Sequence, residues 1–386
     1  MADFYEFFAG GGMVRAGLTS DWNCTFANDF DVMKAQVYSK NWGSDHLLVE
    51  DVAKVTTADL PGCADLAWAS FPCQDLSLAG AYAGIGHRAN KELSRSGTFW
   101  PFWSLMRELQ KEKRAPKIVV LENVYGILRS NKGNDFKAIA SAFSGLNYRF
   151  GAVVMDAKYF VPQSRPRVFI IGVRRDLPIP KKLMISNPQG IWHPSALNEA
   201  FTLLSGEAKR KWVWWNIPLP AKREKSFRDL IQEEPEGVKW HTKAETKRLL
   251  DLMTPVNRTK VTAAQKKNCL MVGGLYRRTR IENGLRVQRA EVRFDDISGC
   301  LRTPSGGSSR QTILIVNGAS IRSRLLAPRE AMGLMGLAED YKIPERYNDA
   351  YRVAGDGVAV PVVGHLERYI FNPVLNYVSE LSLAAE

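Results

Sequence analysis

Short apolar runs alternate with amphipathic segments over the first 180 residues of the chain. Segment 99–113 has apolar residues at helical spacing and ends in basic residues, as expected for a helix that packs on one face. Strands that alternate with such helices predict a doubly wound, Rossmann-like α/β domain with a mainly parallel sheet. The runs that predict buried strands are Phe4–Ala9, Thr25–Asn28, Asp65–Ser70, Ile118–Glu122 and Val168–Val173.

This pattern breaks after Arg175. Prolines, a cluster of tryptophans and several basic clusters interrupt the periodicity, which predicts a second, irregular domain. Apolar runs return after about residue 350, and we expect that segment to rejoin the first domain. The predicted division is therefore 1–180 with 351–386 for the α/β domain and 181–350 for the second domain.

The positive charge is concentrated in the second domain. The chain has 53 Lys and Arg against 40 Asp and Glu, a net charge of +13. Residues 181–328 hold 27 basic and 13 acidic side chains, a surplus of +14, and the remaining chain holds 26 and 27. A surplus in one stretch predicts a region that binds a polyanion, although a solvated basic face without a partner would have the same composition.

Composition narrows the class of protein. With 45% hydrophobic and 24% charged residues, the chain is typical of a globular protein, not of a disordered or collagen-like one. No apolar run approaches the roughly 18 residues of a membrane span, and segment 1–8 is not a secretory signal. The five cysteines form no CxxC pair, so we expect a reducing, cytoplasmic compartment and no metal site.

A glycine-rich loop, Gly10–Gly12, ends the first apolar run. Backbone without Cβ atoms lets a ligand approach its N–H groups. The spacing matches neither dinucleotide nor phosphate loops, because Arg15 stands where a third glycine would fall. Asp29 follows the second run, where an acid commonly holds a ribose, and Phe30 could stack on a base. These residues predict an adenosine-bearing cofactor without pyrophosphate; an ordinary tight turn is the alternative.

Two further strands are followed by reactive groups. Cys73 comes after the third run, and the stiff Pro72 precedes it. Segment 80–97 is basic and rich in small residues, which indicates a mobile lid over that thiol. Glu122 ends the fourth run and could share a proton with a ligand. Taken alone, Cys73 could instead be a buried core cysteine, and Glu122 could be an acid that caps the next helix.

Two arginines begin the fifth run. Arg165 and Arg167 alternate along a strand, so both guanidiniums could face one site, or they could form an exposed basic edge. A second glycine turn, Gly355–Gly357, could complete the cofactor pocket or simply begin a helix.

In their joint order these motifs resemble those of the DNA (cytosine-5) methyltransferases, from Phe4 to about Ile370. Only the stretch between about 181 and 320 is unmatched; that family has its variable target-recognition domain there, and it coincides with the basic surplus. Glu6 and Asp356 depart from the commoner residues of the family. The matching blocks are the Phe-Ala-Gly loop, Pro72-Cys73-Gln74, Glu122-Asn123-Val124, Gln163-x-Arg165-x-Arg167, the block from Arg324 to Glu330 with Met335-Gly336, and the Gly355 loop.

The resemblance implies S-adenosylmethionine as cofactor and S-adenosylhomocysteine as product. It implies a thiolate, Cys73, that adds to C6 of a flipped cytosine so that C5 can accept the methyl group. Glu122 would bind N3 and the exocyclic amine, and Arg167, with Arg165 nearby, would hold O2 and position Glu122. The residues expected to line the cofactor are Phe8, Ala9, Gly10, Gly12, Asp29, Phe30, Asp51, Val52, Pro72, Thr98, Phe99, Asp356 and Val358.

The implied partner is double-stranded DNA, with a cognate restriction endonuclease as a second partner if the enzyme belongs to a prokaryotic or phage restriction–modification system. A tRNA methyltransferase of the same family, a catalytically silent DNA-binding protein and a Rossmann oxidoreductase are the rival interpretations. The residues expected to contact DNA are Gln74, Ser77, Arg88, Asn123, Arg277, Arg278, Arg280, Arg302 and Arg310.

Overall fold

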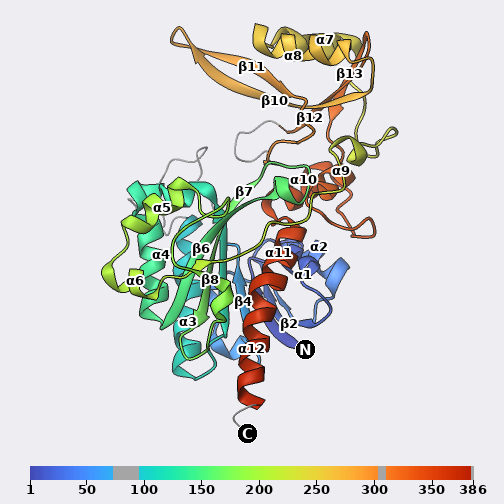
Figure 1. The fold of residues 1–386 in the computed structure, drawn as a ribbon. Coiled ribbons are helices and arrows are strands. Elements are labelled where there is room, and N and C mark those ends of the chain that lie inside the picture. The colour runs from blue at the N-terminus through green and yellow to red at the C-terminus, as the bar shows by residue number, and fades with distance from the viewer. Residues whose placement is uncertain (73–94, 303–309, 384–386) are drawn as a thin grey trace. The chain divides into compact units, whose positions relative to one another are not determined.

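The computed structural model describes residues 1–72, 95–302 and 310–383 (Figure 1). Segment 181–220, which the sequence pattern assigned to the second domain, lies with the first of two compact units, and the short segment 157–165 lies with the second. Unit 1 comprises Met1–Asp156, Pro166–Pro220 and Val360–Glu386, and unit 2 comprises Ala157–Arg165 and Ala221–Ala359. The division into catalytic and target-recognition parts stays a prediction.

Unit 1 is built on a seven-stranded sheet with the order β3-β2-β1-β4-β5-β7-β6 (Figure 1). The first five strands of this order are parallel, and β7 is antiparallel to both of its neighbours. The predicted α/β class with a mainly parallel sheet is confirmed. The strands are β1 Ala2–Phe7, β2 Trp22–Asn28, β3 Leu47–Leu48, β4 Leu66–Ala69, β5 Ile118–Val124, β6 Tyr148–Asp156 and β7 Pro166–Arg174.

Helices cover both faces of this sheet. On one face, α3 (Phe99–Lys111), α4 (Asn134–Gly145), α5 (Ser195–Thr202) and α6 (Gly206–Lys211) share one apolar core with alternate strand residues. Alternation follows from the pleat, which sends successive side chains of a strand to opposite faces. The other elements of unit 1 are α1 Met13–Gly17, α2 Val32–Trp42, the small pair β8 Met184–Ile185 and β9 Trp214–Trp215, α11 Val360–Leu366 and α12 Asn372–Leu383.

The C-terminal segment of unit 1 packs against its N-terminal strands. Phe371 lies against Trp22 and Trp68, with ring centroids 6.3 and 6.4 Å apart. Glu367 is buried, and its carboxylate accepts hydrogen bonds from the Thr19 amide (3.0 Å) and the Trp22 indole (3.1 Å). A buried carboxylate needs such donors, so these contacts fix the returning chain.

Unit 2 contains a four-stranded antiparallel sheet in the order β11-β10-β12-β13. Two helices pack on it through a small core that includes Leu249, Val261, Leu275 and Leu314. The sequence pattern predicted irregular structure here, so this region is more regular than expected. The elements are α7 Lys243–Asp251, α8 Pro255–Lys266, β10 Met271–Glu282, β11 Leu285–Arg293, β12 Thr312–Asn317, β13 Ser320–Leu325, α9 Pro328–Gly333 and α10 Tyr347–Asp356.

A buried ion pair links β13 to α9 in unit 2. Arg324 and Glu330 are both fully buried and form two hydrogen bonds, of 2.8 and 2.6 Å. The Glu330 carboxylate also accepts the backbone N–H groups of Ala327 (2.7 Å) and Gln232 (2.8 Å). These bonds satisfy both charges, as buried ions require. In the part of the chain that the structure describes, no helix is long and apolar enough to cross a membrane.

Candidate active site

The candidate motifs of unit 1 lie at one edge of the sheet. Because β1, β2, β4 and β5 are parallel, their carboxyl ends meet at this edge. The glycine loop follows β1, Asp29 and Phe30 follow β2, Phe71 and Pro72 follow β4, and Glu122 lies near the end of β5. Ligands of such sheets bind at this edge, so these residues form the candidate site.

The glycine loop after β1 has a left-handed backbone at three positions. Phe8 and Gly10 both have φ of +57°, and Gly12 has φ of +76°. A Cβ atom at Gly12 would lie 2.3 Å from Nε1 of Trp42, whereas a Cβ atom at Gly10 would meet nothing within 4 Å. Gly12 is therefore required by packing, and Gly10 borders open space that a ligand can approach.

Asp29 and Phe30 stand beside this loop. Asp29 is buried, and its two carboxylate oxygens accept the backbone N–H groups of Gly10 and Asp31, each at 2.8 Å. Burial raises the pKa of Asp29. Each oxygen keeps a second lone pair, so a ribose hydroxyl could still donate to it. The Phe30 side chain is 66% exposed, which leaves its ring available to a base.

Asn28, which the sequence analysis missed, positions the neighbouring segment. Its buried side-chain amide donates to the carbonyls of Leu48 (3.0 Å) and Glu50 (2.9 Å). These bonds hold the chain that leads to Asp51, whose exposed carboxylate accepts the Ala53 N–H at 2.9 Å. The signal in the sequence is an amide at the end of an otherwise apolar strand. Val52, expected at the adenine edge, is buried.

Glu122 and Arg167 form an ion pair at the end of β5. Val124 lies directly opposite Arg167 in the β5–β7 register, so Glu122 is a diagonal neighbour of Arg167 on the same face of the sheet. Nε of Arg167 lies 3.1 Å from Oε1 of Glu122. Their side chains are 14% and 9% exposed, so the pair is largely shielded from water.

Asn123 anchors the chain just before the expected nucleophile. It is buried, and its amide donates to the carbonyl of Phe71 at 3.1 Å. Phe99 is also fully buried and packs on Phe71, with ring centroids 5.6 Å apart. These contacts hold the Phe71–Pro72 segment, and the expected contacts of Asn123 with DNA and of Phe99 with the cofactor stay predictions. Thr98, at the start of α3, is partly exposed. Cys73, Gln74, Ser77, Arg88 and most of the expected lid lie outside the described residues.

Comparison with known proteins decides the family. The family model described as C-5 cytosine-specific DNA methylase matches residues 2–372. The chain belongs to this family. It is a DNA (cytosine-5) methyltransferase, a class of enzyme that uses S-adenosylmethionine.

Individual relatives agree with this assignment. The Type II methyltransferase M.HhaI of Haemophilus parahaemolyticus is 25% identical over 97% of this chain and 95% of its own length. M.BsuFI of Bacillus subtilis is 29% identical over 67% of each chain. Among solved structures, the Dnmt2 methyltransferase of S. pombe superposes with a TM-score of 0.57 at 16% identity, over 97% of this chain and 99% of that one, which shows a shared fold.

In this methyltransferase the two arginines before and within β7 have different partners. Arg167 contacts Glu122 in unit 1. Arg165 is buried in unit 2, where it donates to the carbonyls of Gly355 (2.8 Å) and Gly357 (2.7 Å). These contacts assign Arg165 to holding the Gly355–Gly357 segment, and its catalytic role stays a prediction. Gly355 and Asp356 form the end of α10, with a buried Val358 beyond it; Asp356 and Val358 as cofactor contacts also stay predictions.

The arginines expected to contact DNA lie on several elements of unit 2. Arg277, Arg278 and Arg280 are exposed on β10, and Arg302 is exposed in the segment after β11. Arg310 is less accessible, because it donates to the Asn348 side chain and lies over the Tyr347 ring at 5.4 Å. Contact of these arginines with DNA stays a prediction.

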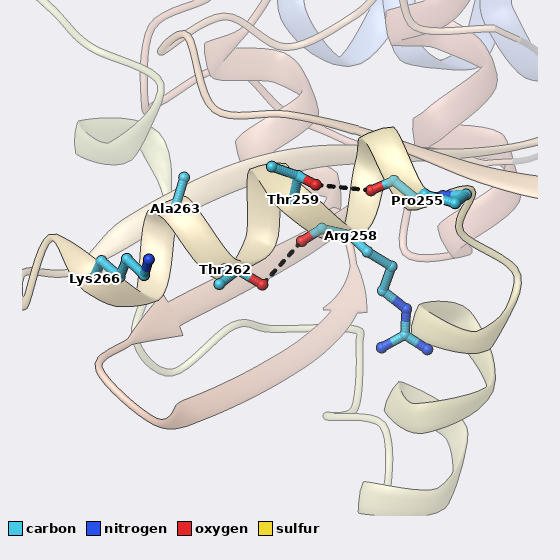
Figure 2. A pocket seen from close by; sticks show the side chains of 6 residues that line it. All are labelled: Pro255, Arg258, Thr259, Thr262, Ala263 and Lys266. Atoms are coloured by element: carbon cyan, nitrogen blue, oxygen red, sulfur yellow. Dashed lines mark hydrogen bonds between the residues drawn. The ribbon is translucent and has the colours of Figure 1, made fainter.

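A shallow hollow lies along α8, and its lining has neither an acidic side chain for a ribose nor an aromatic ring for a base (Figure 2). One helix alone supplies its lining, and two of its threonines, Thr259 and Thr262, donate to carbonyls one turn earlier. The lining residues are Pro255, Arg258, Thr259, Thr262, Ala263 and Lys266. Over the described ranges, no group of three His, Cys, Asp or Glu side chains could hold a metal ion.

Proposed function

We propose that this methyltransferase modifies a specific sequence of duplex DNA and that Cys73, Glu122 and Arg167 carry the chemistry. The observation that supports the proposal most directly is the shielded Glu122–Arg167 ion pair, at the sheet edge to which Asn123 ties the Phe71–Pro72 segment. The chain reaches the expected nucleophile two residues after Phe71, so this anchor limits where the thiol can lie.

The residues at the glycine loop fit S-adenosylmethionine. Open space above Gly10, the exposed ring of Phe30 and the Asp29 carboxylate provide an approach, a stacking surface and an acceptor for ribose hydroxyls. When bound, this cofactor supplies an electrophilic methyl group. Phe8, Ala9, Gly12, Asp51 and Val52 would border the same space.

Each catalytic side chain has a distinct task. Cytosine C5 is a poor nucleophile, and addition of the Cys73 thiolate to C6 makes C5 electron-rich. Addition places negative charge on the ring, which Glu122 offsets by passing a proton to N3 and taking it back when the C6–S bond breaks. Arg167 holds Glu122 in place and binds O2. After methylation, water removes the C5 proton, the C6–S bond breaks and the thiolate is released.

Unit 2 has the charge expected of a DNA-binding part. It contains 28 Lys and Arg and 17 Asp and Glu, a net charge of 28 − 17 = +11, which is most of the +13 of the whole chain. A target cytosine must leave the duplex to reach a thiol, and a basic unit can hold the flanking phosphates while this occurs.

Methyl transfer to nucleic acid tests the proposal. With tritiated cofactor, we expect the label in duplex DNA and none in tRNA. Bisulfite sequencing of DNA from expressing cells should give one modified sequence. Label in tRNA alone would support the rival RNA enzyme, and no label in either would support a silent binding protein. Because the relatives are bacterial Type II and phage orphan methyltransferases, we further propose a role inside a prokaryotic cell, alone or with a restriction endonuclease.

A further inference from the structure

The β10–β11 hairpin of unit 2 extends as a two-stranded ribbon beyond its packed base. Figure 1 shows it reaching past α8. The two strands pair without interruption from Gly274 and Arg293 to the turn, where Asn283 and Gly284 both have positive φ. Such a turn matches the twist of a hairpin. From Arg277 to the turn, the β10 side chains are exposed except for the half-buried Glu282.

The two faces of this ribbon differ in charge. Residues paired across an antiparallel ladder share a face, and successive pairs alternate between faces. The register therefore separates two sets, which we call the paired face and the open face. Between Tyr276 and Glu291, the paired face carries Tyr276, Arg278, Arg280, Glu282, Leu285, Val287, Arg289 and Glu291. The open face carries Arg277, Thr279, Ile281, Arg286 and Gln288.

Acidic partners neutralise most of the paired face. The Glu291 carboxylate accepts a hydrogen bond from Nε of Arg280 at 2.7 Å, and Nε of Arg278 lies 3.5 Å from its other oxygen. The Glu282 carboxylate accepts a hydrogen bond from Nε of Arg289 at 2.8 Å. Arg278 also lies over the ring of Tyr276, 5.9 Å from its centroid. Three arginines thus share two carboxylates, which leaves this set of five side chains with a net charge of +1.

The open face carries two arginines and no acid. Between them lie the exposed Thr279 and Gln288, directly opposite each other, and Ile281 is 76% exposed. Two cations, a hydroxyl, an amide and an apolar group form the set of contacts that base edges accept.

The base of the open face is anchored in the core of unit 2. Leu275, Ala290 and Val292 lie on the same face and pack with Met253 of the α7–α8 connection and Val261 of α8. Ala290, opposite Arg277, is the last buried residue of this face toward the turn, and the open-face residues beyond it are exposed. The ribbon is therefore held at its base and exposed toward its tip.

We propose that the open face enters the major groove of duplex DNA and contacts base edges there, while the paired face supports the ribbon from the other side. The proposal rests on the proposed function. The major groove, about 12 Å wide, admits a two-stranded ribbon. Arginine pairs with guanine, glutamine with adenine, and threonine or an apolar group with the thymine methyl. The deep, narrow major groove of an RNA helix excludes the same ribbon.

Two charge-matched double variants of the full chain test this assignment. Arg277→Ala with Arg286→Ala and Arg278→Ala with Arg280→Ala each remove two positive charges from the same hairpin. We expect the first variant to weaken binding to the duplex that carries the target sequence by about 100-fold, and the second variant to weaken it by less than about 5-fold. The second variant also leaves Glu291 without these two arginines, so its negative charge would repel phosphates. This effect can only reduce the difference that we expect between the two variants. Equal losses in the two variants would overturn the proposal.

A charge-neutral variant separates base contacts from phosphate contacts. Gln288→Ala should lower the preference for the target over unrelated duplex by about 10-fold and leave binding to unrelated duplex unchanged. An unchanged preference would contradict base contact by this face, and thermal unfolding checks that each variant is folded. If the parent enzyme methylates no duplex DNA, the proposed function fails; if it does so and the two double variants behave alike, only the ribbon assignment fails.

Discussion

The role proposed for Arg167 can be tested by removing its side chain. Replacing it by alanine leaves the shielded carboxylate of Glu122 without this cation. We expect Arg167→Ala to reduce methyl transfer by about 100-fold or more, because a lost oriented donor costs that much in comparable sites. Cofactor binding, measured by calorimetry, should stay within a few-fold of the parent.

A matched control lies on the same strand. Arg174, at the end of β7, pairs with Asp176 and donates to the carbonyl of Ala115. Arg174→Ala removes the same side chain outside the candidate site, so methyl transfer should remain near that of the parent. Equal activity losses in the two variants would argue against a specific role for Arg167.

The buried carboxyl group of Glu6 should make the stability of the fold depend on pH. It is buried beside the glycine loop, where one carboxylate oxygen accepts the Val14 N–H at 3.3 Å and the other has no hydrogen-bond partner among the residues that the structure describes. Burial raises its pKa to about 8. The folded state therefore keeps a proton that the unfolded chain, with a pKa of about 4.3, releases.

It follows that Glu6 stabilises the fold below about pH 5 and that this contribution is lost as the pH rises toward 8. The free energy of unfolding should fall by up to about 1.4 kcal/mol per pH unit in that interval. Urea unfolding of the parent and of Glu6→Gln at pH 6, 7 and 8 measures the effect. The difference between the two proteins should change with pH, and a constant difference would refute the assignment.

At the scale of elements, two glycines of one loop have different roles: packing requires Gly12, whereas Gly10 borders the open space above the loop. Gly12→Ala should destabilise the fold strongly, because its Cβ atom would clash with Trp42. Gly10→Ala should cost only about 1 kcal/mol for its positive φ, yet weaken cofactor binding at least 10-fold, because the added methyl group points into the open space.

Gly43 is the control for Gly10. It also has a positive φ, of +82°, and a Cβ atom there would meet nothing within 4 Å. Because its ψ of 174° places it in a region that only glycine favours, Gly43→Ala should lose at least as much stability in urea as Gly10→Ala and still bind S-adenosylmethionine like the parent. Equal cofactor affinities for all three proteins would show that the space above Gly10 is not the cofactor site.

The elements of unit 1 could be predicted because their periodicity follows burial. The predicted helix 99–113 is observed as Phe99–Lys111, since Phe102, Met106 and Leu109 face one core. The β10–β11 ribbon could not be predicted, because both of its faces are exposed near the turn and leave no alternation of apolar residues. The boundary at 180 also differs from the observed 220, because Val213 is tied to β6 by a hydrogen bond to Phe150 that no local pattern reveals.

The sequence could predict which site residues lie at the ends of strands, but it could not predict which groups their side chains contact. The sheet topology brings the glycine loop, Asp29 and Glu122 to one edge, as the order of apolar runs indicated. The different partners of Arg165 and Arg167 depend on where β7 begins, at Pro166, one residue after Arg165. Asn28 and Asn123 act through bonds to backbone carbonyls about 20 and 52 residues away, which the sequence does not display.

For the whole molecule, the uneven charge predicts two different salt dependences. DNA affinity should fall steeply between 50 and 200 mM salt, with a log–log slope of about −4 or steeper, because unit 2 would displace counterions from several phosphates. Cofactor affinity should barely change over the same range. A DNA slope near zero would contradict the assignment of unit 2 to the phosphate backbone.

The central claim concerns a covalent bond between Cys73 and the target base. Duplex DNA that carries 5-fluorocytosine at the modified position blocks release, because fluorine cannot leave as the C5 proton does. We predict that the enzyme with S-adenosylmethionine forms a stable protein–DNA complex whose mass-mapped attachment site is Cys73, and that Cys73→Ser forms none. A complex attached at another residue, or full methyl transfer by Cys73→Ser, would contradict the account.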